Sequence, residues 1–191
     1  MNPTNDKAFK EWAVVVRALE AGESMLLIRK GGVVEEGGAL RLSDPEFFFF
    51  PNHTHQSGDQ LQPRAHGFLA ESEAERPEEG TVRISSFAEV LRVWIVTDEA
   101  TLASLESEHV WTTECVTERF RYKPTDPLFA IALRVYRLPE PVQLPYLSAY
   151  RGCTSWVTLD APLSTEGAIP VIDDAACMAR LSALSALLDK I

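Results

Sequence analysis

Cysteine is scarce in this 191-residue chain, which contains only Cys115, Cys153 and Cys177. The three residues are odd in number, lie far apart in the sequence and form no CxxC pair. A disulfide framework or a structural zinc site needs paired or closely spaced cysteines, so the sequence argues against both. We expect reduced and mostly buried thiols, as in a cytoplasmic protein.

Long hydrophobic runs are also missing. No apolar stretch approaches the roughly 18 to 20 residues that a membrane-spanning helix needs. Residues 1–12 lack the basic-then-apolar pattern of an export signal. We therefore expect a soluble cytoplasmic protein with no membrane partner.

Positive charge is in short supply as well. The chain has 18 Lys and Arg residues against 28 Asp and Glu residues, which gives a formal net charge of −10 and a pI near 4.9. At long range such a charge repels nucleic acid and anionic membranes. A role in binding nucleic acid would therefore depend on a local basic patch.

The order of hydrophobic segments predicts a single α+β domain over residues 1–191. We expect a helix over residues 6–12, then a β-hairpin from the alternating stretch 12–19 and the run 25–30. Capping residues and apolar spacing predict further helices over 98–107 and 112–121, and one at the C-terminus that begins near Asp173. Further strands are expected at 39–42, 46–50, 87–97, 128–138 and 156–159. Without regular βα alternation, a mixed and mostly antiparallel sheet is favoured, with the C-terminal helix and the short helices packed on it.

The stretch EFFFFPNHTHQ, residues 46–56, is the most distinctive part of the sequence. Four consecutive phenylalanines between Pro45 and Pro51 indicate a strand buried on both faces. We expect the rim of any active or binding site to lie at the polar end of this strand. In contrast, residues 57–80 are rich in glutamate and poor in apolar residues, and they predict an acidic mobile excursion within the domain.

Several segments together resemble one protein family. They are KEWAVVVRAL near the start, RKGG at 29–32, FFFFPNHTHQ, HVWT at 109–112, RFRYKP at 119–124, LRVYRLPEP at 133–141 and YRGCTSW at 150–156. The combination resembles the bacterial proteins grouped as domain of unknown function 1802 (DUF1802). The resemblance spans nearly the whole chain and implies a single-domain protein, but it brings no established activity. Within it, His55 lies at a position that matches the family pattern.

Two segments carry the residue types that bind anions. Arg29, Lys30, Gly31 and Gly32 follow a predicted strand, and cations beside flexible backbone N–H groups can bind a phosphate or a carboxylate. A glycine turn with solvated cations would produce the same pattern, and no Walker A sequence is present. In the second segment, cations alternate with aromatic residues, as single-stranded nucleic acid or a nucleotide requires. The candidates there are His109, Trp111, Arg119 and Lys123.

A metal site is the main alternative. In an extended strand His53 and His55 would point to the same side, and an HxH pair can supply two ligands to zinc, manganese or iron. Glu35 and Glu36 could complete the site or act as a base. The same histidines could equally be polar residues at the end of the phenylalanine strand.

These observations support two hypotheses. The first is a binding module for a nucleotide, nucleic acid or other anionic ligand, with no cofactor, which uses the RKGG segment, His55, Gln56 and the 109–123 segment. The second is a metal-dependent phosphodiesterase or nuclease-like hydrolase that uses His53, His55 and Glu35 or Glu36 with a divalent metal. The ligand, the oligomeric state and the presence of an enzymatic activity are left open by the sequence.

Overall fold

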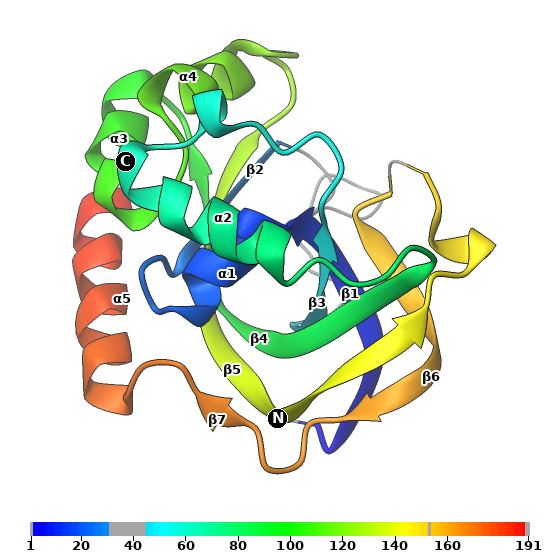
Figure 1. Ribbon diagram of the computed structural model, residues 1–191. Helices are drawn as coiled ribbons and strands as arrows, with labels where there is room; N and C mark the ends of the chain where they lie inside the picture. Colours follow the sequence, from blue (N-terminus) through cyan, green and yellow to red (C-terminus); the bar gives the residue numbers. More distant parts are fainter. Residues whose placement is uncertain (1, 31–44, 153, 190–191) are drawn as a thin grey trace.

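The structure is a computed structural model, and it describes residues 2–30, 45–152 and 154–189. A strongly curved sheet forms one side of the molecule, and helices cover its other side and one end (Figure 1). Among the described residues the sheet has seven strands. They are β1 (Thr4–Trp12), β2 (Leu26–Lys30), β3 (Glu46–Asn52), β4 (Thr81–Val96), β5 (Leu128–Pro145), β6 (Trp156–Ser164) and β7 (Ile169–Pro170).

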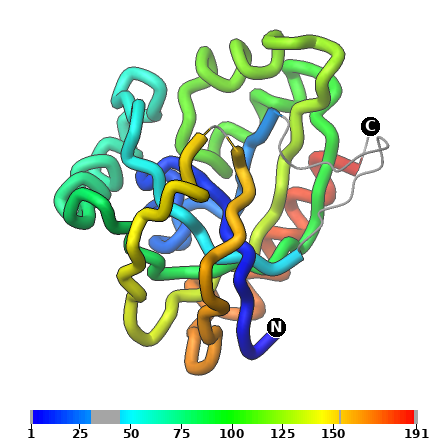
Figure 2. Tube along the Cα trace, turned by 90° about the vertical axis from the view of Figure 1, so that its right-hand side faces the viewer, coloured from blue at the N-terminus to red at the C-terminus, as the bar shows by residue number. Residues whose placement is uncertain are grey.

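The strand order confirms a mixed and mostly antiparallel sheet in an α+β fold. The order is β2-β5-β4-β3-β1-β6, and β7 pairs with β5. β1 and β3 pair in parallel, whereas the other described pairs are antiparallel. Figure 2 shows β1, in blue, beside β6, in orange. Because β1 and β3 run in the same direction, their carboxyl ends lie together, with Trp12 opposite Asn52.

Five α-helices are described: α1 (Ala13–Glu20), α2 (His66–Ala74), α3 (Glu99–Ser104), α4 (Thr113–Arg121) and α5 (Asp174–Leu188). Three begin where capping residues were expected: the side chains of Asp98, Thr112 and Asp173 each accept a hydrogen bond from a backbone N–H in the first turn. None of the described helices combines the length and the apolar character needed to cross a membrane.

The phenylalanine strand β3 belongs to two hydrophobic cores at once. Phe47 and Phe49 point into the larger core, which includes residues of α1, α4 and α5, and Phe48 and Phe50 point into a smaller core on the opposite face. Each of the four side chains is 2% exposed or less. The expectation of a strand buried on both faces is therefore confirmed. This alternation follows from the two-residue period of a strand.

The prediction for residues 6–19 was wrong, because helix and strand are exchanged there. Residues 6–12 belong to β1, and the expected hairpin strand is the helix α1. Seven of the eight residues of α1 are buried, including Glu20, and its three consecutive valines are typical of a strand. Packing of α1 against the sheet outweighs this local preference.

The other expected elements agree with the structure more closely. The predicted strands at 46–50, 128–138 and 156–159 lie within β3, β5 and β6, the one at 87–97 ends one residue beyond β4, and β6 is an edge of the sheet. The predicted strand at 39–42 lies outside the described residues. Within 57–80 the chain forms two short 3-10 turns and α2, and the mobility of this excursion stays a prediction.

Replacement of Phe48 by Ala tests the role of the phenylalanine strand. Phe48 is fully buried and lies against Phe87 with ring centroids 5.9 Å apart. We expect Phe48→Ala to lower the free energy of unfolding by about 3–5 kcal/mol, because the lost ring leaves a cavity. Urea unfolding monitored by circular dichroism measures this change.

The control is Met178→Ala on α5, where the methionine side chain is 61% exposed. Its truncation should change the free energy of unfolding by roughly 0.5 kcal/mol or less. Equal losses in the two variants would contradict the structural role assigned to β3.

Candidate functional site

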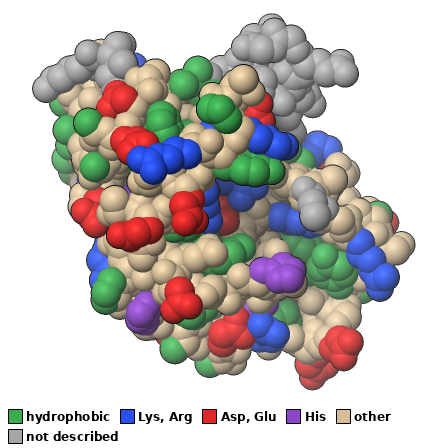
Figure 3. Space-filling model, turned by 90° about the horizontal axis from the view of Figure 1, so that it is seen from above, with side chains coloured by type: hydrophobic (Ala, Val, Ile, Leu, Met, Phe, Trp, Pro, Cys, Tyr) green, Lys and Arg blue, Asp and Glu red, His purple; other side chains and the backbone are tan. Residues whose placement is uncertain are grey.

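Four segments far apart in the sequence meet at a hollow beside the carboxyl ends of β1 and β3. The hollow has a volume of about 250 Å³. Figure 3 looks onto this side of the molecule, whose surface is hollowed near its centre, where cationic and acidic side chains lie together. The lining residues are Lys10, Glu11, Trp12, Arg29, Asn52, Gly152, Thr154 and Ser155. We refer to these eight residues as the strand-end pocket.

A buried ion pair forms one wall of the strand-end pocket. The Glu11 side chain is 4% exposed, and its Oε2 lies 3.1 Å from Nη1 of Arg29. The backbone N–H of Trp12 donates to Oε1 of the same carboxylate at 2.8 Å, and Nη2 of Arg29 donates to Oγ of Ser155 at 2.8 Å. A carboxylate buried without such partners would be costly. The pair therefore fixes the guanidinium of Arg29 at the pocket.

Lys10 connects β1 to the opposite wall. Its Nζ donates to the backbone carbonyls of Tyr150 and Gly152, and its backbone N–H donates to the carbonyl of Ser155 at 2.8 Å. Two cations, Lys10 and Arg29, and one carboxylate, Glu11, therefore line the strand-end pocket.

Aromatic rings lie behind the pocket. Trp12 packs edge-on against Trp111 with ring centroids 4.9 Å apart, and the guanidinium carbon of Arg119 lies 3.6 Å from the centroid of Trp111. Trp111 is only 3% exposed. Burial lowers the pKa of Arg119 below its usual value and raises the pKa of the nearby Cys115 thiol. Trp111 and Arg119 therefore support Trp12 from below and offer little surface to a ligand.

The structure separates the remaining binding candidates from the strand-end pocket. Nζ of Lys30 donates to the carbonyl of Phe120 at 2.6 Å, and Lys123 is exposed at the end of α4. Oε1 of Gln56 accepts a hydrogen bond from the Val14 N–H at 2.8 Å, so this side chain serves the first turn of α1. None of these residues lines the pocket. The candidates Gly31 and Gly32 lie outside the described residues.

The geometry assumed for the histidine pair was wrong. His53 and His55 follow the end of β3 in a turn, and His55 has a φ of 65°, so the two residues are not part of an extended strand. Nδ1 of His53 lies 3.8 Å from Oε1 of Glu73, and burial lowers the pKa of His53. Glu35 and Glu36 lie outside the described residues. Among the residues described, no three histidine, cysteine or acidic side chains form a group suited to a metal ion, and a metal at these histidines stays a prediction.

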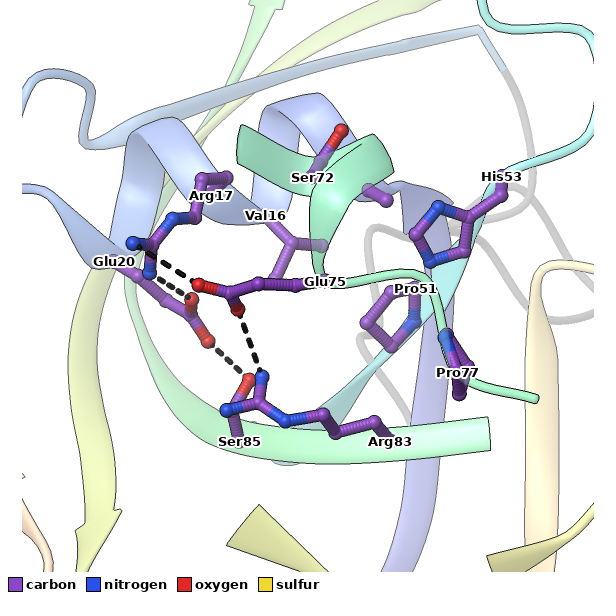
Figure 4. Close-up of a pocket in the computed structure, with 11 residues that line it drawn as sticks. Val16, Arg17, Glu20, Pro51, His53, Ser72, Glu75, Pro77, Arg83 and Ser85 are labelled. Carbon is purple, nitrogen blue, oxygen red and sulfur yellow. Dashed lines mark hydrogen bonds and ion pairs between the residues drawn. The ribbon is translucent and has the colours of Figure 1, made fainter. Parts of the chain in front are cut away.

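A second cluster of charges lies between α1, α2 and β4 (Figure 4). Buried Glu20 accepts a hydrogen bond from Ser85 at 2.5 Å, and Glu75 lies 3.4 Å from Arg17 and 3.1 Å from Arg83. The cavity among these side chains has a volume of about 30 Å³, which is enough for only one or two water molecules. The cluster ties α2 to the rest of the fold and has no room for an organic ligand.

Comparison with known families identifies the chain. A family model described as a domain of unknown function, DUF1802, matches residues 8–183 of the 191. The chain belongs to the DUF1802 family. All eight residues of the strand-end pocket fall within the part that matches the DUF1802 model.

Two solved structures resemble this DUF1802 chain weakly. Both are crystal structures of mutant forms of the ZmASCH protein from Zymomonas mobilis. One has 12% sequence identity and a TM-score of 0.44, and covers 96% of this chain and 99% of that chain. The other has 13% identity and a TM-score of 0.43, and covers 93% and 96%. Similarity at this level establishes no shared function. No curated protein matches the DUF1802 chain.

Sequence reasoning missed most of the strand-end pocket. It selected Arg29, but not Lys10, Glu11, Trp12 or Ser155. Three of these four belong to the KEW sequence at the end of β1, and Ser155 belongs to YRGCTSW. Both segments are parts of the family resemblance. One pattern in the sequence could have located the pocket. In several of the segments that carry the family resemblance, polar residues lie at the end of a predicted strand or directly after it.

His109 gives a pH-dependent test of the region beneath the pocket. The side chain is 1% exposed, and neither ring nitrogen has a hydrogen-bond partner among the described residues. Burial, and then the charges of Arg64 and Arg119, lower the pKa of His109 to about 4. The unfolded chain therefore binds a proton near pH 6.5 that the folded chain does not bind until about pH 4, so stability falls as the pH falls through this window.

We expect the wild type to lose roughly 3 kcal/mol more unfolding free energy between pH 7 and pH 4 than His109→Phe, which has no proton to bind. Urea unfolding at several pH values measures the difference. Parallel losses in the two proteins would show that His109 is not buried in its neutral form.

Proposed function

We propose that this protein is a binding module whose strand-end pocket takes a nucleotide-sized anionic ligand. The observation that carries the proposal is the composition of the pocket. Two cations, an indole ring and three uncharged polar side chains converge there from four segments of the chain. Ligand sites commonly combine an apolar surface with a few convergent polar groups.

Each class of side chain suits one part of a nucleotide. The ammonium group of Lys10 and the guanidinium of Arg29 match phosphate oxygens, with which charge-assisted hydrogen bonds form. The half-buried ring of Trp12 is suited to stacking on a base. The side chains of Asn52, Thr154 and Ser155 can donate and accept hydrogen bonds at the sugar or the base edge.

Charge argues for a small ligand over a long polyanion. The whole protein carries a formal net charge of −10, which opposes the approach of duplex nucleic acid at long range. The ammonium and guanidinium groups that line the pocket act at short range on a ligand with one or two phosphates. A pocket of about 250 Å³ is slightly smaller than the usual range for small-molecule sites, which also favours a small ligand.

Lys10→Gln tests the proposal with little disturbance of the fold, because glutamine keeps a hydrogen-bond donor but carries no charge. Isothermal titration calorimetry with adenosine 5′-monophosphate measures the affinity. We expect Lys10→Gln to weaken binding about tenfold or more, because a charge-assisted hydrogen bond contributes roughly 1.5–3 kcal/mol. Binding should also weaken when the salt concentration is raised from about 50 to 200 mM.

Lys7→Gln is the matched control. Lys7 lies on the same strand, and its Nζ contacts Asp6 and Thr158 outside the pocket. Its replacement removes the same charge from the protein and should leave the affinity within about twofold of the wild type. If wild-type protein binds no nucleoside monophosphate, or if both lysine variants weaken binding equally, the pocket is not the binding site.

A further inference from the structure

A second hollow adjoins the strand-end pocket. It has a volume of about 400 Å³, and Asn52 lines both hollows. Arg151, which lines the second hollow, directly precedes Gly152 of the strand-end pocket. A ligand longer than one nucleotide could therefore pass from one hollow to the other along Asn52. We call the second hollow the Tyr146 pocket, after the aromatic residue in its wall.

The Tyr146 pocket repeats the chemistry of the first. The ring of Tyr146 is 38% exposed, and it is held by edge-on contacts with Phe50 at 5.7 Å and Tyr150 at 6.2 Å between centroids. Arg151 is exposed and forms no ion pair with the residues that the structure describes. Each hollow therefore has one accessible aromatic ring and a cation able to meet a phosphate.

Asn52 is suited to a position between two units of one ligand. Its Oδ1 accepts a hydrogen bond from the backbone N–H of Thr54 at 3.0 Å, which fixes the side chain. Its Nδ2 has no hydrogen-bond partner in the described parts of the chain. A fixed amide donor between two aromatic rings could contact a sugar or phosphate that links two bases.

We propose that the ligand is a short single-stranded oligonucleotide, with one nucleotide in the strand-end pocket and its neighbour in the Tyr146 pocket. This inference rests on the function proposed above and adds the class of ligand. Two separate concave sites suit bases that are splayed apart, whereas the bases of a duplex stay stacked inside the helix. Glu78 and Glu79 also line the Tyr146 pocket and oppose a long polyanion there, which favours a short segment.

A length series tests the inference. Calorimetry would compare adenosine 5′-monophosphate with 5′-phosphorylated di- and tetranucleotides, each as DNA and as RNA, and with a duplex. We expect the dinucleotide to bind about tenfold more tightly than the mononucleotide, because a second base gains a stacking partner. The tetranucleotide should gain little more, and the duplex should bind more weakly than either single strand. The DNA and RNA arms show which sugar is preferred.

Variants of the Tyr146 pocket separate this inference from the proposed function. Tyr146→Ala and Arg151→Gln should lower dinucleotide affinity to the mononucleotide level and leave mononucleotide affinity unchanged, whereas Tyr146→Phe should keep the gain. Tyr122→Ala, which removes a tyrosine that is 63% exposed on another part of the surface, is the matched control and should have no effect.

The outcomes distinguish the two proposals. If the mononucleotide binds but the dinucleotide binds no more tightly, the second site is wrong and the strand-end pocket stands. If Arg151→Gln and Tyr146→Ala weaken mononucleotide binding as much as dinucleotide binding, the two hollows are not separate sites. If no nucleotide of any length binds, both proposals fail.

Discussion

The parallel pairing of β1 with β3 is the constraint on which the rest of the molecule depends. β3 carries four phenylalanines that alternate between two cores, so neither its register nor its direction can change without exposing aromatic rings to water. Because β1 pairs in parallel with β3, it must run in the same direction as β3. The chain continues from β1 into the buried helix α1. Both strands therefore end at one edge of the molecule, and the polar residues that follow the phenylalanines meet those that end β1. The pocket is a consequence of how the core is built.

Electrostatics at this edge are set by the burial of Glu11. A buried carboxylate needs cations and N–H donors, and the fold supplies them from β2 and from the backbone of Trp12. Arg29 is thereby held in one orientation with the hydroxyl of Ser155. Such a fixed guanidinium loses less side-chain entropy when it meets an anion than a solvated one would. Under the proposed function, local order of this kind would let a protein with a formal net charge of −10 bind an anion at one position.

Much of the fold could be predicted from the sequence, because local signals were strong where they agreed with the packing. The phenylalanine run, the caps Asp98, Thr112 and Asp173, and the apolar stretch of β5 each carry a pattern with one simple interpretation. The α1 segment does not, since its three consecutive valines are typical of a strand. The candidate site was harder to predict from the sequence than the α1 helix. Lys10 and Glu11 become neighbours of Asn52 and Ser155 only through the pairing of β1 with β3 and β6, a long-range relation that no local pattern reveals.

If the ends of β1 and β3 form a ligand pocket, a bound ligand must perturb the residues that line it. The most direct test is a titration of ¹⁵N-labelled protein with adenosine 5′-monophosphate, followed by two-dimensional NMR. We expect the largest shifts at the indole N–H of Trp12 and at the backbone amides of Arg29, Asn52 and Ser155, with little change at His55, Gln56 or Lys123. Shifts confined to the His55 turn or to the end of α4, with none at Trp12, would contradict it.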